Sequence, residues 1–126
     1  MKVEQCGIIL NVYHFDACVA FYKTVFGLEE QFSKVDGDFR LTCLAFGSAY
    51  LMIETGGVAS AEEKSPAQTA TILRFNVADI HAAFNTIRAH DSHARLIEND
   101  WGTIVRCVDP DGNPVSVRAS AGFIPA

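Results

Sequence analysis

Apolar and polar positions recur along the chain in an order that predicts one series of elements, found twice. In the first copy, residues 6–13 form a short apolar run typical of a strand. Residues 16–26 carry apolar side chains at helical spacing, with Asp16 as a cap and Gly27 as the end of the helix. Three further strands are expected, at residues 29–35, 39–46 and 49–54.

The second copy lies 65 residues further on and aligns with the first without a gap, so that the chain contains an internal repeat. The aligned positions include Asn11-Val12 with Asn76-Val77, Gly37 with Gly102, and Gly47 with Gly112. Its elements are predicted as a strand at residues 70–77, a helix at 79–89, and strands at 94–98, 103–109 and 114–119. The pattern thus predicts a first βαβββ module at residues 1–57, a small polar linker at 58–69, and a second module at 70–126.

Several short motifs within these modules match a known family. They are Val19-Ala20-Phe21-Tyr22, Phe26-Gly27-Leu28, Trp101-Gly102 and Asp109-Pro110-Asp111-Gly112-Asn113. With them the chain resembles the vicinal oxygen chelate superfamily, which includes glyoxalase I, extradiol dioxygenases, fosfomycin-resistance enzymes and bleomycin-binding proteins. The resemblance implies an α+β fold, the glyoxalase/bleomycin resistance/dihydroxybiphenyl dioxygenase fold. In it, two tandem βαβββ modules form an open eight-stranded cup, with the helices outside and the active site inside.

The same resemblance locates the positions at which metal-using relatives carry His, Glu or Gln. In this sequence they are Gly7, Leu51, Ile72 and Ser116. A shift of one residue gives Cys6, Met52, Thr71 and Val117 or Val115 instead. Neither set supplies a carboxylate or an imidazole, whereas a divalent cation of this kind needs about three protein ligands. We therefore expect no metal ion and no other cofactor.

Histidine and cysteine offer few other candidates for chemistry. His14 falls where a turn or capping residue is expected, and the remaining histidines, His81, His90 and His93, are expected at the surface. The four cysteines are expected to be buried, reduced thiols. Cys43 and Cys107 lie on predicted strands, where a nucleophile is conceivable, but a place in the core is the expected one.

Strand alternation assigns side chains to the cup. On the first strand Ile8, Leu10 and Val12 should face the helix, and on the last strand Val115 and Val117 should do so. The residues predicted to line a ligand pocket are Ile9, Asn11, Phe39, Leu51, Ile53, Arg74, Trp101, Arg106, Ser116 and Arg118. Trp101 would either stack on a planar ligand or cover the core. Arg74 and Arg118 need partners in an apolar cup, and a ligand anion or carbonyl would serve if no acidic side chain is near.

Composition and charge narrow the class of partner. An apolar content of 49% and a charged content of 20% are those of a globular protein. The net charge of −5 argues against nucleic acid as a partner. The chain shows neither a signal peptide nor an apolar stretch of membrane-spanning length, so we expect a cytoplasmic protein with no membrane partner. A homodimer is expected because open sheets leave strand edges to be covered, and swapped and side-by-side arrangements both remain open.

Three functions fit this sequence. The first is metal-independent binding, and so sequestration, of a small molecule, as in the bleomycin-binding branch of the resemblance. The second is an enzyme of lyase, isomerase or dioxygenase type, acting on a small oxygenated substrate at a non-standard site or through arginine and cysteine groups directly. The third is a partner-binding module whose cup is filled by its own side chains. We favour the first function, because the positions at which relatives bind a metal carry no metal-binding side chains here.

Overall fold

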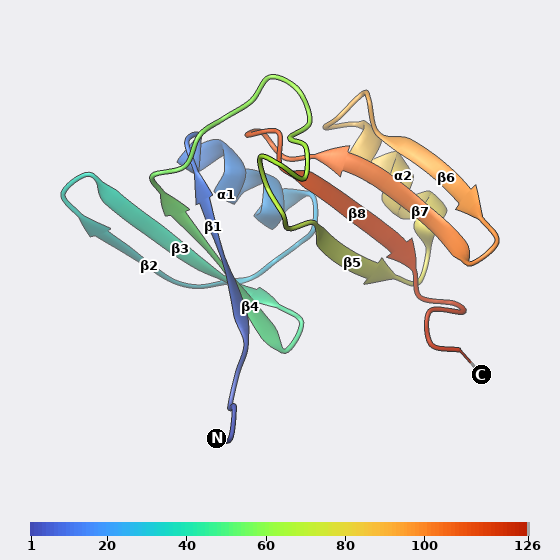
Figure 1. Ribbon diagram of the computed structural model, residues 1–126, viewed down its shortest axis with the longest axis horizontal. Helices are drawn as coiled ribbons and strands as arrows, with labels where there is room; N and C mark the ends of the chain where they lie inside the picture. The colour runs from blue at the N-terminus through green and yellow to red at the C-terminus, as the bar shows by residue number, and fades with distance from the viewer. Residues whose placement is uncertain (126) are drawn as a thin grey trace. The chain divides into compact units, whose positions relative to one another are not determined.

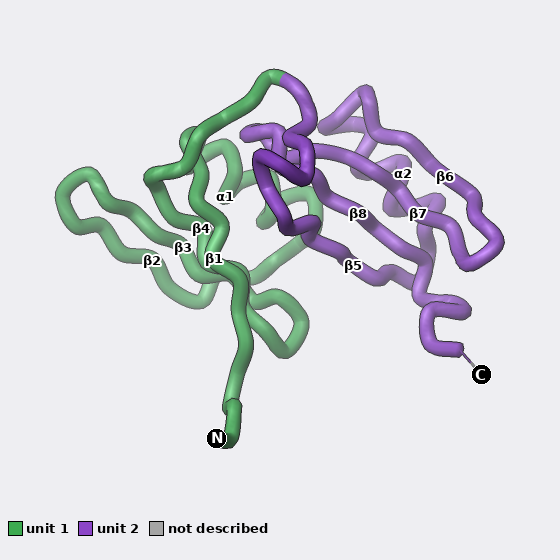
Figure 2. Tube along the Cα trace, in the orientation of Figure 1, with its two compact units in different colours: residues 1–61 green, residues 62–126 purple. Residues whose placement is uncertain are grey.

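The computed structural model describes residues 1–125, which divide into two compact units between residues 61 and 62 (Figure 2). Each unit contains one helix and one four-stranded sheet (Figure 1). The elements of the first unit are β1 (Gly7–Val12), α1 (Phe15–Thr24), β2 (Glu30–Asp36), β3 (Phe39–Phe46) and β4 (Ala49–Thr55). Those of the second are β5 (Leu73–Val77), α2 (Ile80–Arg88), β6 (Arg95–Asn99), β7 (Gly102–Val108) and β8 (Pro114–Ala119). The predicted α+β class and the repeated βαβββ order are confirmed.

The first sheet has the strand order β1-β4-β3-β2, with β1 and β4 parallel and the other pairs antiparallel. The helix α1 packs on the face formed by β3 and β4. Apolar side chains between helix and sheet are buried, and they are Val12, Phe15, Cys18, Tyr22, Leu44, Leu51 and Ile53. Each contributes roughly 1.5–3 kcal/mol through removal from water, so this layer is what holds α1 on its sheet.

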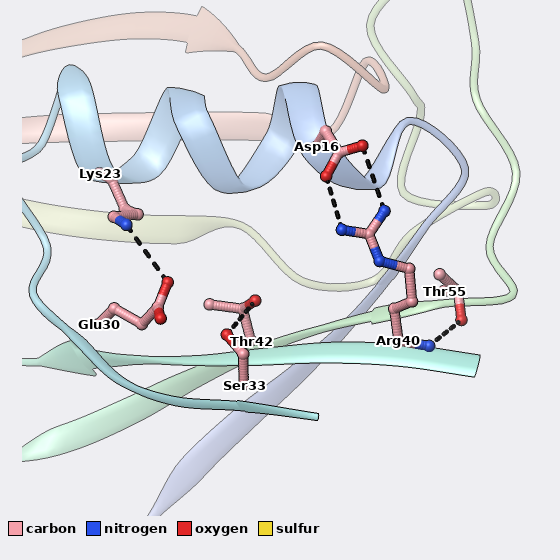
Figure 3. A network of polar contacts seen from close by, with 7 residues as sticks. All are labelled: Asp16, Lys23, Glu30, Ser33, Arg40, Thr42 and Thr55. Atoms are coloured by element: carbon pink, nitrogen blue, oxygen red, sulfur yellow. Dashed lines mark hydrogen bonds and ion pairs between the residues drawn. The ribbon is translucent and has the colours of Figure 1, made fainter. Parts of the chain in front are cut away.

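The start of α1 differs from the expected cap. His14 occupies the N-cap position and makes no side-chain hydrogen bond to the helix, while Asp16 lies in the first turn. Asp16 accepts hydrogen bonds from both terminal nitrogens of Arg40 on β3, at 2.8 and 3.2 Å (Figure 3). The Arg40 guanidinium lowers the pKa of the Asp16 carboxyl and also lies 4.4 Å from the centre of the Phe15 ring. Asp16 therefore ties α1 to the sheet, and the prediction that it caps the helix is wrong.

The second sheet repeats this plan with the order β5-β8-β7-β6, and α2 packs on β7 and β8. Here the cap is made by Asp79, whose side chain accepts from the backbone N–H of Ala82 at 3.0 Å. The buried apolar layer consists of Leu73, Ile80, Ile87, Val105, Cys107, Val115 and Val117. Neither helix is long and apolar enough to span a membrane, which holds for all of the described chain.

The gap-free offset of 65 residues fails in the last strand. Phe46 pairs with Ala49 across a two-residue turn, but Val108 pairs with Pro114 across the five residues 109–113. The two turns differ in length by an odd number of residues, so β8 is shifted by an odd number of residues from the position that a constant offset predicts. An odd shift exchanges the two faces of a strand.

The consequence is a correction to the predicted pocket. Leu51 pairs with Ile8 and Ile53 pairs with Leu10, on the face that α1 covers, and both are fully buried. The prediction that Leu51 and Ile53 face away from the helix is therefore wrong. Met52, not Leu51, lies on the face opposite α1, at the place that Ser116 has in the second sheet. Cys6 also departs from expectation because it is exposed, whereas the other three cysteines are buried.

Candidate functional site

The open face of each sheet is defined here as the face opposite its own helix. On the open face of the second sheet, strand pairing places Arg74 and Arg106 on either side of Ser116, and Arg95 beyond Arg106. Paired residues on neighbouring strands point to the same face, so these side chains form one row across all four strands. We name Arg74, Ser116, Arg106 and Arg95 the basic row. Arg95 was missed in the sequence, although alternation along residues 94–98 carried the signal.

The corresponding row of the first sheet is apolar. It consists of Ile9, Met52, Cys43 and Phe32, joined by the same pattern of strand pairs. Ile9 and Phe32 are about half exposed, and Cys43 is buried. Phe39 and Asn11, two other predicted pocket residues, also lie on this open face, where Asn11 donates from Nδ2 to the Thr55 carbonyl at 3.2 Å. The two sheets thus share a plan and differ in the chemistry of their open faces.

Ser116 has an unusual environment within the basic row. Its side chain is 1% exposed, and its Oγ has no hydrogen-bond partner among the described residues. A buried hydroxyl without a partner costs about 1–3 kcal/mol, so it marks a place where a group from outside the chain would be stabilising.

The arginines of the row have few acidic neighbours. Arg106 donates to Glu63 at 3.4 Å, a long contact at a partly exposed position. Arg74 and Arg95 are exposed and form no ion pair with a carboxylate in residues 1–125. Two of the three guanidinium groups in the row are therefore without an acidic partner.

Arg118 has its partners within the second unit. It donates to the backbone carbonyls of Trp101 and Ala119, and the rings of Trp101 and Phe123 lie 5.4 and 5.1 Å from its guanidinium carbon. Only 4% of Arg118 is exposed. The expectation that a ligand would supply its partner is thus not met, because backbone and aromatic rings already do so. Trp101 is 54% exposed, and its ring contacts the Arg118 guanidinium.

A cavity of about 350 Å³ opens beside the basic row. It is lined by Arg106 and Pro114 of the sheet, by Ile72 directly before β5, and by residues 63–66, 69 and 70, all of the second unit. Its volume is in the range of small-molecule sites. Residues 63–66 and 69 lie in the predicted linker and residue 70 in a predicted strand, so none of them was predicted to line a cavity.

Part of the cavity wall is fastened to the turn before β8. Lys64 is buried and donates from Nζ to the Asn113 side chain at 2.9 Å, and its backbone N–H donates to the Gly112 carbonyl at 2.9 Å. Asp109 holds this turn through hydrogen bonds from the backbone N–H groups of Asp111 and Asn113. The Asp-Pro-Asp-Gly-Asn motif therefore positions residues 63–66 as well as the last strand.

The positions at which relatives hold a metal do not fit one here. With the register corrected, they are Gly7, Met52, Ile72 and Ser116. At Gly7 the ring of Tyr50 occupies the adjacent space, and a side chain would require this ring to move, because a Cβ atom there would lie 2.1 Å from it. Within residues 1–125, no three His, Cys, Asp or Glu side chains gather as a metal site would require.

Cys43 and Cys107, two of the buried cysteines, are poor nucleophiles. Burial raises the pKa of the Cys107 thiol to about 12, with the carboxylate of Asp91 adding to the effect. Burial also raises the pKa of Cys43. Since the thiolate is the reactive form, both side chains remain protonated and inert near neutral pH.

Comparison with known proteins agrees with the fold described above. The family model described as Glyoxalase/Bleomycin resistance protein/Dioxygenase superfamily matches residues 3–117. A search of curated protein sequences gives no significant match. Among solved structures, lactoylglutathione lyase from Agrobacterium tumefaciens is 24% identical, with 97% of this chain and 98% of that chain covered and a TM-score of 0.70.

Two further structures are similar in fold. A mutant fosfomycin resistance protein from Listeria monocytogenes, complexed with Mn(II) and dihydroxypropylphosphonic acid, is 17% identical, with 94% and 93% of the chains covered and a TM-score of 0.73. An antibiotic-binding protein from Streptomyces is 15% identical, with 94% and 98% covered and a TM-score of 0.67. At such identities the likeness concerns the fold. Because the family model spans nearly the whole chain, the protein belongs to the glyoxalase/bleomycin resistance protein/dioxygenase superfamily.

Proposed function

We propose that this protein binds a small molecule without a resident metal ion. The observation that carries the proposal is the chemistry of the four corresponding positions: Gly7 has no side chain, and the ring of Tyr50 occupies the space beside it. The other three positions carry Met52, Ile72 and Ser116, which offer one hydroxyl and no carboxylate or imidazole. A divalent cation needs about three protein ligands, and these four residues do not supply them.

Two further observations support binding as the activity. The cavity beside the basic row has the size and the mixture of apolar and polar walls that small-molecule sites have. The solved antibiotic-binding protein from Streptomyces shows a fold of this kind in a binding protein.

A calorimetric titration of chelator-stripped protein with Mn²⁺, Ni²⁺, Fe²⁺ and Zn²⁺ tests the proposal. We expect no 1:1 binding tighter than about 1 μM, roughly −8 kcal/mol. The control is the His90→Ala, His93→Ala double variant, which removes the exposed His93 that lies 4.0 Å from Asp91 and so tests for weak surface binding of zinc. A tight ion that stays bound in the double variant contradicts metal independence and returns the protein to the metal-using branch.

The proposal includes a homodimer in the cytoplasm. Strand β2 lies at the edge of its sheet and every residue of it is exposed, including Phe32 and Val35. An uncovered edge with apolar side chains is commonly paired with a second chain. Sedimentation velocity is expected to give the mass of two chains, and Val35→Lys, which charges this edge, is expected to shift the population toward one. A single-chain mass at micromolar concentration contradicts the dimer.

A further inference from the structure

We infer that the basic row on the open face of the second sheet binds the anionic oxygens of a small molecule, either a carboxylate or a phosphate group. This inference rests on the proposed function, because it names the chemical class of the ligand. Its evidence is separate, however, and comes from charge, burial and space in the second unit alone.

Three positive charges lie in one row across the second sheet. Arg74 and Arg106 each pair with Ser116, so one strand separates them, and Arg95 pairs with Arg106 directly. Neighbouring strands lie about 4.8 Å apart, which brings three guanidinium groups into one row. Like charges opposite each other destabilise a sheet, whereas a bound anion turns the same arrangement into attraction. Arginine is suited to this role because its planar fork donates two hydrogen bonds to one carboxylate or phosphate.

The hydroxyl between these arginines is unpaired among the described residues. Ser116 Oγ is buried and has no hydrogen-bond partner in the described chain. The O–H group can rotate to donate a hydrogen bond to an oxyanion. A ligand oxygen at this row would therefore satisfy a buried donor that the chain itself leaves unsatisfied.

A cavity adjoins the basic row. Pro114 precedes Ser116 by two residues on β8, so it lies on the same open face, and Ile72 directly precedes β5. Both residues line the 350 Å³ cavity. Arg106 belongs to the cavity wall and to the basic row. A ligand whose anionic end meets the row thus has room for a small uncharged part beside Ile72 and Pro114.

One acidic side chain near the basic row is expected to compete with a ligand anion for Arg106. Glu63 contacts Arg106 at 3.4 Å and is partly exposed, so it occupies the guanidinium weakly when no ligand is bound. Arg118 is saturated by backbone carbonyls, and Lys64 is held by Asn113, so neither is assigned to the anion. Removal of the Glu63 charge should therefore strengthen anion binding.

The test is a titration of ¹⁵N-labelled protein with phenyl phosphate, with benzoate, and with benzyl alcohol as the uncharged counterpart, followed by amide and arginine Nε–H resonances. We expect saturable 1:1 binding of at least one of the two anions, with shifts centred on Arg74, Arg106 and Ser116, and none with benzyl alcohol at the row. Arg106→Gln and Arg74→Gln should each weaken binding about tenfold or more, and Ser116→Ala by several-fold. Glu63→Gln should tighten it several-fold.

Arg88→Gln is the matched control, because it removes the same charge from α2, where Arg88 contacts Phe84 and Asn85. It should leave anion binding unchanged. Equal weakening by Arg88→Gln and Arg106→Gln, or shifts spread over all basic residues without saturation, would overturn the inference. The two anions distinguish a carboxylate from a phosphate site. If neither binds while the metal titration stays blank, the anion inference fails and metal-free binding stands. A tight metal ion defeats the proposed function whatever the anions do.

Discussion

Leu51→Glu is expected to unfold the first unit, whereas Met52→Glu one position further on is expected to leave it folded. Leu51 is fully buried between α1 and the sheet, so a glutamate there loses apolar contacts and places a carboxyl group away from water. The loss should be at least about 4 kcal/mol, a large part of the stability of a typical domain. Met52 points to the open face, where a carboxylate reaches water and the cost should stay below about 1 kcal/mol.

Urea denaturation followed by circular dichroism, together with the dispersion of amide resonances, measures both variants. Leu51→Met is the control for size, because it keeps an apolar side chain of similar volume and should cost less than about 1.5 kcal/mol. The reverse result, a folded Leu51→Glu and an unfolded Met52→Glu, would restore the gap-free offset of 65 residues and contradict the strand register described above.

Asp109→Ala is expected to destabilise the second unit by about 3–5 kcal/mol. Asp109 is 3% exposed, and its Oδ1 accepts from the backbone N–H groups of Asp111 and Asn113 at 2.8 and 2.9 Å. Its Oδ2 accepts from the Asn113 side chain at 2.9 Å. Alanine leaves these donors buried without their acceptor, and hydrogen bonds to a charged group are the stronger ones.

The same variant should loosen the cavity wall, since Lys64 is fastened to this turn through Gly112 and Asn113. Urea denaturation gives the loss of stability, and faster hydrogen exchange of the Lys64 amide reports the loosened wall. Asp109→Asn is the matched control, because its carbonyl oxygen still accepts from the two backbone donors, and it should cost about half as much. A loss below about 1 kcal/mol for Asp109→Ala would mean that the turn forms without this carboxylate.

The order and class of the elements were predictable because each strand and helix carries its own period of apolar residues. Their faces were harder to predict. The constant offset of 65 residues paired Gly37 with Gly102, yet Gly102 begins β7 whereas Gly37 lies in the turn before β3. The apolar pairs Leu51 and Ile53, set against Val115 and Val117, already indicated an offset of 64 residues in the last strand. Turn length decided the register, and the pattern of side chains within the strand recorded it.

The predicted site was limited by contacts between segments far apart in the sequence. Arg118 is satisfied by Trp101 and by Phe123 near the end of the chain, and no local pattern announces such a contact. Glu63 and Lys64 belong to a segment with the composition of a linker, but they line a cavity. The sequence draws attention to Ser116 because metal-using relatives carry a metal ligand at this position. Its interest now lies in a buried hydroxyl that has no partner.

Trp101, the chain's single tryptophan, belongs to the second unit, where it stacks on Arg118. Its three tyrosines, Tyr13, Tyr22 and Tyr50, all belong to the first. The two units therefore carry different chromophores. Fluorescence of Trp101 reports on the second unit, because its emission changes when the contact with the Arg118 guanidinium is lost. Tyrosine absorbance reports on the first, through the fully buried ring of Tyr22. One unlabelled sample thus shows by its optical spectrum whether the two repeats melt together or one after the other.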